Sequence, residues 1–223
     1  GRPARALLGA PKDVSGINLI APPILPSARP SVWLIAHYDS KGQPISMAAR
    51  LSGFLALVIG VLFWALIPST ALGLTVYGLI IVALNRVTNK SPGAVDNASA
   101  LVAVLMTLDQ LPRDARVGVI FSDAEEFGLV GARALAGERA ALFTDAAIIN
   151  LDGLDDTGRV TAFMHPRGPI GEVVAAAQEA RSWRWLPVVV DGIALARVSK
   201  ECVTILKGNL ETMRVVHRQE DSA

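Results

Sequence analysis

The sequence predicts an α/β fold with a mixed, largely parallel central sheet flanked by helices, and with a hydrophobic helical hairpin inserted into it. Short apolar runs, typical of buried strands, alternate with segments in which apolar residues recur at helical spacing. Histidine or carboxylate residues follow several of these runs. One long stretch, residues 51–85, contains no charged residue at all.

The predicted strands are apolar runs bounded by polar residues or glycine: residues 31–36, 117–121, 146–151 and 203–206. The predicted helices are residues 97–111, 129–138 and 170–181. The first of these helices stops before Pro112, and the last follows a Gly-Pro start. Strands that alternate with helices along the chain favour parallel pairing.

Composition excludes some classes of partner. The 223 residues carry a net charge of +1, and 18% of them are charged. The chain therefore lacks the strong basic field that binds nucleic acid, and no nucleic-acid partner is expected. The only cysteine, Cys202, excludes an intramolecular disulfide, and its apolar neighbours predict a buried structural thiol.

The uncharged stretch is bounded by Arg50 and Arg86, and Pro68 divides it into two apolar arms. Each arm is slightly shorter than the about 20 residues that a bilayer crossing needs. Extending the first arm back to Ile45, with the arginine snorkelling to the interface, brings it to full length. We therefore expect residues 45–85 to contact membrane lipid as transmembrane helices. The alternative is a pair of core helices in a soluble protein.

The expected organisation is a discontinuous domain, residues 1–44 with 86–223, interrupted by the hairpin at 45–85. Basic residues flank the hairpin on the side of this domain: Lys41, Arg50, Arg86 and Lys90. The positive-inside rule then predicts a membrane-associated protein with its main domain on the cytoplasmic face. Nothing in the sequence indicates the oligomeric state.

Potential metal ligands follow the predicted strands. His37 and Asp39 come after the first, Glu125 and Glu126 after the second, and Asp152 after the third. Because the carboxyl ends of parallel strands meet at one edge of a sheet, these side chains are expected to converge.

Two further residues complete the set: His217 lies beyond the fourth strand, and Asp96 stands at the start of a predicted helix. Five carboxylates packed with two histidines would repel one another, and two divalent cations would offset that repulsion. Mixed imidazole and carboxylate donors favour zinc, with manganese or cobalt as alternatives. Adjacent Glu125 and Glu126 suggest one ligand and one general base.

Taken singly, each of these residues has an ordinary structural explanation. Asp96 ahead of an apolar helix is typical of an N-cap, a Glu-Glu pair is usually solvated, and Asp152 before a glycine is typical of a turn. Asp123 is interpreted as a turn residue and His165 as a loop histidine. The order and context of the whole set are what favour a metal site.

Five motifs in this order resemble the di-zinc aminopeptidase family that includes aminopeptidase Y and the bacterial leucyl aminopeptidases. They are residues 36–40 (AHYDS), 93–99 (GAVDNAS), 125–132 (EEFGLVGA), 150–152 (NLD), and 208–209 (GN) leading to 214–217 (RVVH). The resemblance implies a zinc-exopeptidase-like fold. It also implies a zinc-dependent exopeptidase that acts on peptides.

The resemblance assigns the individual roles. Asp96 would bridge two zinc ions. His37 and Asp152 would complete one zinc site, and Glu126 and His217 the other. The catalytic residues implied are Glu125, as general base toward a shared water, and Asp39, which would orient His37.

The function expected is a membrane-tethered metallo-aminopeptidase that releases N-terminal residues. The alternatives are a glutaminyl-cyclase-like single-zinc acyl transfer and an inactive peptidase fold that serves as a membrane interaction module. The sequence departs from the family pattern twice. The hairpin replaces a short loop, and the family continues into a closing helix where this sequence ends soon after His217, so we expect a longer protein.

Overall fold

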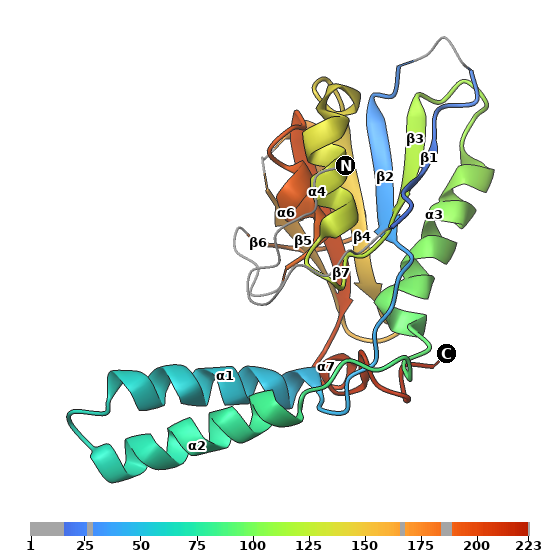
Figure 1. The fold of residues 1–223 in the computed structure, drawn as a ribbon. Helices are drawn as coiled ribbons and strands as arrows, with labels where there is room; N and C mark the ends of the chain where they lie inside the picture. The colour runs from blue at the N-terminus through green and yellow to red at the C-terminus, as the bar shows by residue number, and fades with distance from the viewer. Residues whose placement is uncertain (1–15, 26–28, 166–167, 184–188, 223) are drawn as a thin grey trace. The chain divides into compact units, whose positions relative to one another are not determined.

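In the computed structural model, the described residues are 16–25, 29–165, 168–183 and 189–222, and they form a seven-stranded sheet of order β1-β3-β2-β4-β7-β5-β6 (Figure 1). The strands are β1 (Leu19–Ala21), β2 (Val32–His37), β3 (Val117–Ser122), β4 (Ala147–Leu154), β5 (Arg159–Met164), β6 (Arg181–Trp183) and β7 (Glu201–Gly208). The four strands predicted from the sequence are β2, β3, β4 and β7.

Pairing in the sheet is mixed and mostly parallel, as the sequence predicts. The pairs β2–β3, β2–β4, β4–β7 and β5–β6 are parallel, whereas β1–β3 and β5–β7 are antiparallel. The sequence did not predict β1, β5 or β6. The predicted helix over residues 170–181 is too long: it ends at Ala177, and Arg181 instead pairs with Thr161 in the sheet.

Helices cover both faces of this sheet (Figure 1). They are α3 (Ser99–Gln110), α4 (Val130–Glu138), α5 (Pro169–Ala177) and α6 (Asp191–Leu195). On one face, Ala100 and Val104 of α3 pack on the sheet, and Ile149 joins this cluster to the cluster under α5. On the other face, α4 and α6 pack around Trp33.

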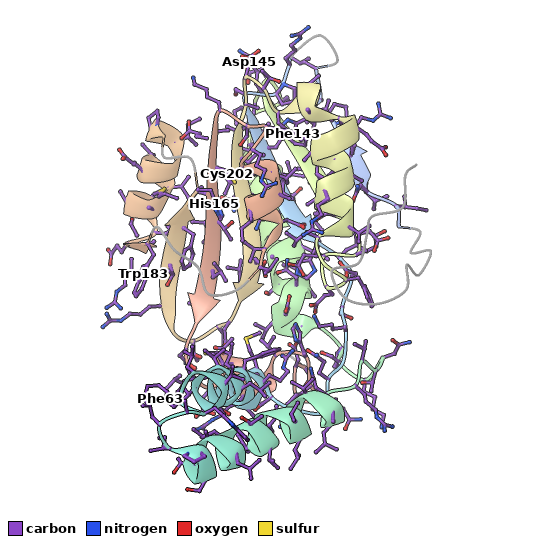
Figure 2. The ribbon with its side chains drawn as sticks, turned by 60° about the vertical axis from the view of Figure 1, so that its left-hand side comes forward. Phe63, Phe143, Asp145, His165, Trp183 and Cys202 are labelled. Atoms are coloured by element: carbon purple, nitrogen blue, oxygen red, sulfur yellow. The ribbon has the colours of Figure 1, made fainter. Side chains whose placement is uncertain are left out.

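The core under α4 and α6 contains one aromatic pair and the only cysteine. The Trp33 indole donates a hydrogen bond to the Leu142 carbonyl oxygen over 2.9 Å, and its ring centroid lies 6.0 Å from that of Phe143. Cys202 is 1% exposed on the central strand β7, with Phe143 toward one end of the sheet (Figure 2). The prediction of a buried structural thiol is confirmed.

The chain divides into two compact units, residues 1–39 with 97–208, and residues 40–96 with 209–223. The first contains the sheet and the helices named above. The second contains α1 (Met47–Leu62), α2 (Pro68–Leu84) and the short α7 (Thr212–Val215). It therefore includes more of the chain than the hairpin expected at 45–85, because the segment that carries His217 also belongs to it.

The uncharged stretch forms the two helices α1 and α2. The Ser46 hydroxyl accepts a hydrogen bond from the Ala49 amide and caps α1, and Pro68 occupies the first turn of α2. Small residues form the contact between the helices. A Cβ atom on Gly53 would lie 2.7 Å from Ile81 Cγ2, so only glycine allows the helices to approach this closely.

Among the described residues, no helix combines the length and the apolar character that crossing a membrane requires. The structure therefore does not support the transmembrane helix expected from Ile45 onward. The chain enters helical geometry only after the Ser46 cap, and α1 has 16 residues and α2 has 17.

Candidate metal centre

His37 is the last residue of β2 and is 2% exposed. Its Nδ1 atom lies 3.0 Å from the Asp39 carbonyl oxygen and 3.5 Å from an oxygen of the Asp39 carboxylate. Both neighbours are hydrogen-bond acceptors, so Nδ1 carries the ring proton and donates it. The lone pair therefore lies on Nε2, which is the arrangement of a metal-binding histidine.

Asp152 lies beside that lone pair. It is 8% exposed, and its Oδ1 atom is 3.8 Å from His37 Nε2. Two ligands of one tetrahedral zinc, each about 2.0–2.1 Å from the ion, are about 3.3 Å apart. The observed spacing is thus close to that of two ligands around one ion.

An irregularity in β4 presents Asp152 at this position. The register between β4 and β7 shifts between Leu151 and Leu154, and Gly153 has a positive φ of 60°. Such bulges redirect a side chain out of the ladder. The Asn97 side chain braces the bulge: its amide donates to the Leu151 carbonyl oxygen, and its oxygen accepts from the Gly153 amide, both over 3.1 Å.

The turn after β3 carries Glu125 and Glu126, and Asp39 holds it. One oxygen of the Asp39 carboxylate accepts the Glu125 amide over 3.0 Å, and the other accepts the Glu126 amide over 3.1 Å. The turn needs such support because Ala124 adopts a φ of 53°, which non-glycine residues rarely do. Asp39 therefore contacts both His37 and the two glutamates.

The Glu125 side chain is buried, at 8% exposed. Burial, together with the neighbouring Asp152 carboxylate, raises the pKa of Glu125 to about 10, while His37 opposes this shift. Protein groups alone thus favour a bound proton on Glu125. Bound divalent cations would favour the ionised base instead.

Asp191 belongs to this cluster and was not predicted. It is the first residue of α6, is 1% exposed, and accepts a hydrogen bond from the Ser122 hydroxyl at the end of β3. Burial raises its pKa to about 6, an effect that Ser122 and His37 reduce. Asp-Gly in the sequence is typical of a turn, so no local signal marked this residue.

In the second unit, Asp96 contacts His217. Asp96 lies in the π-helical turn η1 (Ala94–Ala98), and its Oδ2 atom is 2.8 Å from His217 Nε2. The N-cap explanation for Asp96 is wrong, because the residue preceding α3 is Ala98 and it caps the helix with no side-chain bond. Both side chains are mostly buried, at 12% and 7% exposed.

Asp221 supports the segment that presents Asp96. It is fully buried, and its carboxylate accepts the Val95 amide over 2.7 Å, while its carbonyl oxygen accepts the Ala94 amide over 3.2 Å. The sequence did not predict this role. The two contact partners are more than a hundred residues apart, so no local pattern connects them.

His217 is held by residues close to the hairpin. It has a φ of 67°, and its carbonyl oxygen accepts the Gln43 amide over 2.6 Å. Its Nδ1 atom lies 3.0 Å from Gln43 Oε1 and 2.9 Å from Arg50 Nη2. The sequence predicted neither Gln43 nor Arg50 as part of the site.

Asp123 and His165, which the sequence assigned to a turn and a loop, form hydrogen bonds or close polar contacts outside the predicted metal site. The Asp123 carboxylate accepts the amides of Ile17 and Ala124, each over 2.8 Å, which suits a turn residue. His165 follows β5, and its Nε2 atom lies 2.9 Å from Thr204 Oγ1 within the sheet core (Figure 2).

Each unit thus collects part of the predicted site. The first brings together His37, Asp39, Glu125 and Asp152, with Glu126 in the same turn, and the second joins Asp96 to His217. Imidazole nitrogens and carboxylate oxygens in both units are donors that suit zinc.

The sheet order and these donors at the strand ends define the chain as a zinc-exopeptidase-like α/β protein. More narrowly, it belongs to peptidase family M28, whose pattern matches residues 20–186.

Solved structures support the same fold. BSAP, a zinc aminopeptidase from Bacillus subtilis, is similar with a TM-score of 0.54 at 19% identity, over 92% of this chain and 43% of that one. The Legionella pneumophila LapA aminopeptidase is similar with a TM-score of 0.50 at 11% identity, over 88% of this chain and 46% of that one. The chain therefore spans less than half the length of either structure. Among curated proteins, none matches it.

The pKa of Asp191 predicts a pH-dependent penalty on folding. Because its folded pKa, about 6, is raised above the ordinary value of 3.8, the folded state binds the proton more tightly than the unfolded state does. Its contribution to stability is complete below about pH 4 and is lost as pH rises through about 6. The loss amounts to about 3 kcal/mol.

Urea unfolding of the wild type and of Asp191→Asn, both with chelator present, measures this effect. The free energy of unfolding of the wild type should fall relative to that of the variant between pH 4 and pH 7. The difference in free energy of unfolding between the two proteins cancels the contribution of other titrating groups. Parallel stability profiles for the two proteins would contradict the assignment.

Proposed function

We propose that this chain is the catalytic core of a membrane-tethered metallo-aminopeptidase that hydrolyses N-terminal residues from peptides. Membership of peptidase family M28 supports a peptidase. The observation that carries the proposal is the double contact of Asp39. It accepts hydrogen bonds from the His37 ring and from both amides of the Glu125–Glu126 turn, so it orients a metal ligand and a buried general base together.

The proposed cofactor is a pair of zinc ions. His37 and Asp152 would bind one, Glu126 and His217 the other, and Asp96 both. The position of the next residue supports the role of Asp96. The Asn97 side chain forms hydrogen bonds to the backbone of the two residues that flank Asp152, Leu151 and Gly153.

When bound, the two ions supply a water of lowered pKa and polarise the scissile carbonyl. The side chain of Glu125 accepts the proton of that water and passes it to the leaving amine. Burial suits this role, because a carboxylate with a raised pKa holds a transferred proton. Asp39 keeps the Glu125 backbone in place during the transfer, since its contact is to the main-chain amide.

Glu125→Gln should retain both zinc ions and lose at least about a hundredfold in kcat, since general-base catalysis contributes about 10²–10⁴-fold. Zinc per chain is measured by elemental analysis, and turnover with a chromogenic aminoacyl anilide. Glu126→Gln is the matched control and should lose one zinc. Asp96→Asn should weaken the binding of both ions.

Three outcomes would contradict the proposal. Loss of metal in Glu125→Gln with the fold intact would mean that Glu125 is a ligand. One zinc per chain with pyroglutamate formation would indicate a cyclase. A folded wild type that binds no zinc would indicate an inactive interaction module.

The membrane tether is proposed for the helical pair α1 and α2. Their mutual contact buries glycine and alanine, whereas many of their large apolar side chains are exposed. Leu62 of α1, for example, is 70% exposed, and Leu79 of α2 is 55% exposed. A pair of soluble helices normally buries its large apolar residues, so this reversed pattern favours lipid tails as the surroundings.

The charge pattern favours lipid over a protein partner. No charged residue occurs from 51 to 85, and Arg86, which is exposed, stands at the end of the stretch, where it suits a headgroup layer. A protein partner would cover one side of the pair, whereas lipid covers all sides. We therefore propose that the hairpin enters the bilayer from the side of Arg86.

Flotation with phosphatidylcholine–phosphatidylglycerol vesicles tests the tether. The wild type should float with the vesicles, and the double variant Leu55→Glu with Val58→Glu should not, because charges in the acyl region are costly. The matched control is Val102→Glu with Leu105→Glu, which changes two exposed apolar residues of α3 and should still float. A wild type that stays unbound as a dimer would identify a second copy as the partner instead.

We also propose that the basic flanks of the hairpin lie on the cytoplasmic face, following the positive-inside rule. A cysteine introduced by Lys90→Cys should escape a membrane-impermeant maleimide in intact cells and react after lysis. The native Cys202 is buried and adds little background. Labelling in intact cells would place the hairpin base outside.

A further inference from the structure

The ring of His217 faces two hydrogen-bonding partners at one nitrogen. Gln43 Oε1 lies 3.0 Å from Nδ1 and can only accept, whereas Arg50 Nη2 lies 2.9 Å from Nδ1 and can only donate. Nδ1 cannot serve both, because it carries either a proton or a lone pair. These two neighbours therefore favour opposite tautomers of the ring.

Only one of these tautomers suits metal binding. If Nδ1 accepts from Arg50, the ring proton lies on Nε2 and is donated to Asp96 Oδ2, 2.8 Å away. If Nδ1 donates to Gln43, the Nε2 lone pair is available to a metal ion. His37 differs, because its Nδ1 faces two oxygens of Asp39, and both of them are acceptors.

We propose that Gln43 and Arg50 are positioning residues that act on His217 in opposite directions. Gln43 stabilises the metal-binding tautomer of His217, and Arg50 competes with it. The inference rests on the proposed role of His217 as a zinc ligand. It assigns a task to two residues that belong to neither the ligand set nor the general base.

The surrounding contacts keep both partners in place. The Gln43 amide donates to the carbonyl oxygen of His217 itself over 2.6 Å, and its side-chain amide donates to Asn85 Oδ1 over 3.2 Å. Arg50 also donates to Gln43 Oε1, so it can keep one partner when it leaves the ring. Arg50 lies in the first turn of α1, which connects the hairpin directly to a candidate metal ligand.

The experiment compares zinc affinities of the full chain by competition with a chromophoric chelator. Arg50→Met should bind zinc more tightly, by about tenfold, because it removes the stabilisation of the competing tautomer. Gln43→Met should bind zinc more weakly, by about 10- to 100-fold, as expected for the loss of a hydrogen-bond partner of a ligand. Arg86→Met, at the other end of the hairpin, should leave the affinity within about twofold of wild type, since Arg86 is exposed.

The decisive result is that zinc affinity rises in Arg50→Met and falls in Gln43→Met. If both residues only stabilised the base of the hairpin, both variants would lose affinity, and that result would overturn the inference. An unchanged affinity in Arg50→Met would also overturn it. His217→Ala separates this failure from that of the proposed function: it should bind one zinc fewer, and an unchanged zinc content would reject His217 as a ligand.

A second test measures the tautomer of His217 in the wild type, so it does not depend on whether a variant folds. The chain has three histidines, so ¹⁵N spectra of the imidazole rings are readily assigned. With chelator present, the His217 proton should lie on Nε2, and zinc should move it to Nδ1. A proton already on Nδ1 without zinc would overturn the inference.

Discussion

The arrangement of the first unit depends on the hydrogen bonds of Asp39. Its carbonyl oxygen accepts a hydrogen bond from His37, and its carboxylate accepts hydrogen bonds from the two amides of the Glu125–Glu126 turn. These groups come from β2 and β3, which pair in parallel so that His37 lies opposite Ser122. A single residue thus links a candidate ligand to a candidate base, and its carboxylate compensates for the unfavourable backbone of Ala124.

The two candidate histidine ligands have different surroundings. His37 ends a central strand, and its partner is two residues away along the chain. His217 lies in the second unit, and its partners are 167 and 174 residues away. The environment of one ligand is therefore local and resembles the family motif, whereas that of the other depends on Gln43 and on Arg50 of α1.

The hairpin follows a different packing rule from the sheet domain. Around the sheet, large side chains such as Trp33 and Phe143 are buried. Between α1 and α2 the buried residues are glycine and alanine, and many of the leucine and valine side chains are exposed. The hydrophobic effect explains the first arrangement in water, and the second is stable where the surroundings are apolar.

Several features could be predicted from the sequence because their signals are local. Apolar runs marked β2, β3, β4 and β7, and the residues after them marked His37, Asp39, Glu125 and Asp152. The short strands β1 and β6 and the helix α6 were missed, since three to five residues carry no periodic pattern. The same absence of a signal hid Asp191 and Asp221.

The sequence by itself determined the fold class, the family and the identity of the candidate ligands, because strand patterns and motifs depend on neighbouring residues. Only the tertiary structure decided which nitrogen of His37 faces the oxygens of Asp39, how Asp39 supports the glutamates, and that Gln43 and Arg50 face the same atom of His217. Hydrogen bonds between remote segments set these features, and their partners are defined only once the chain has folded.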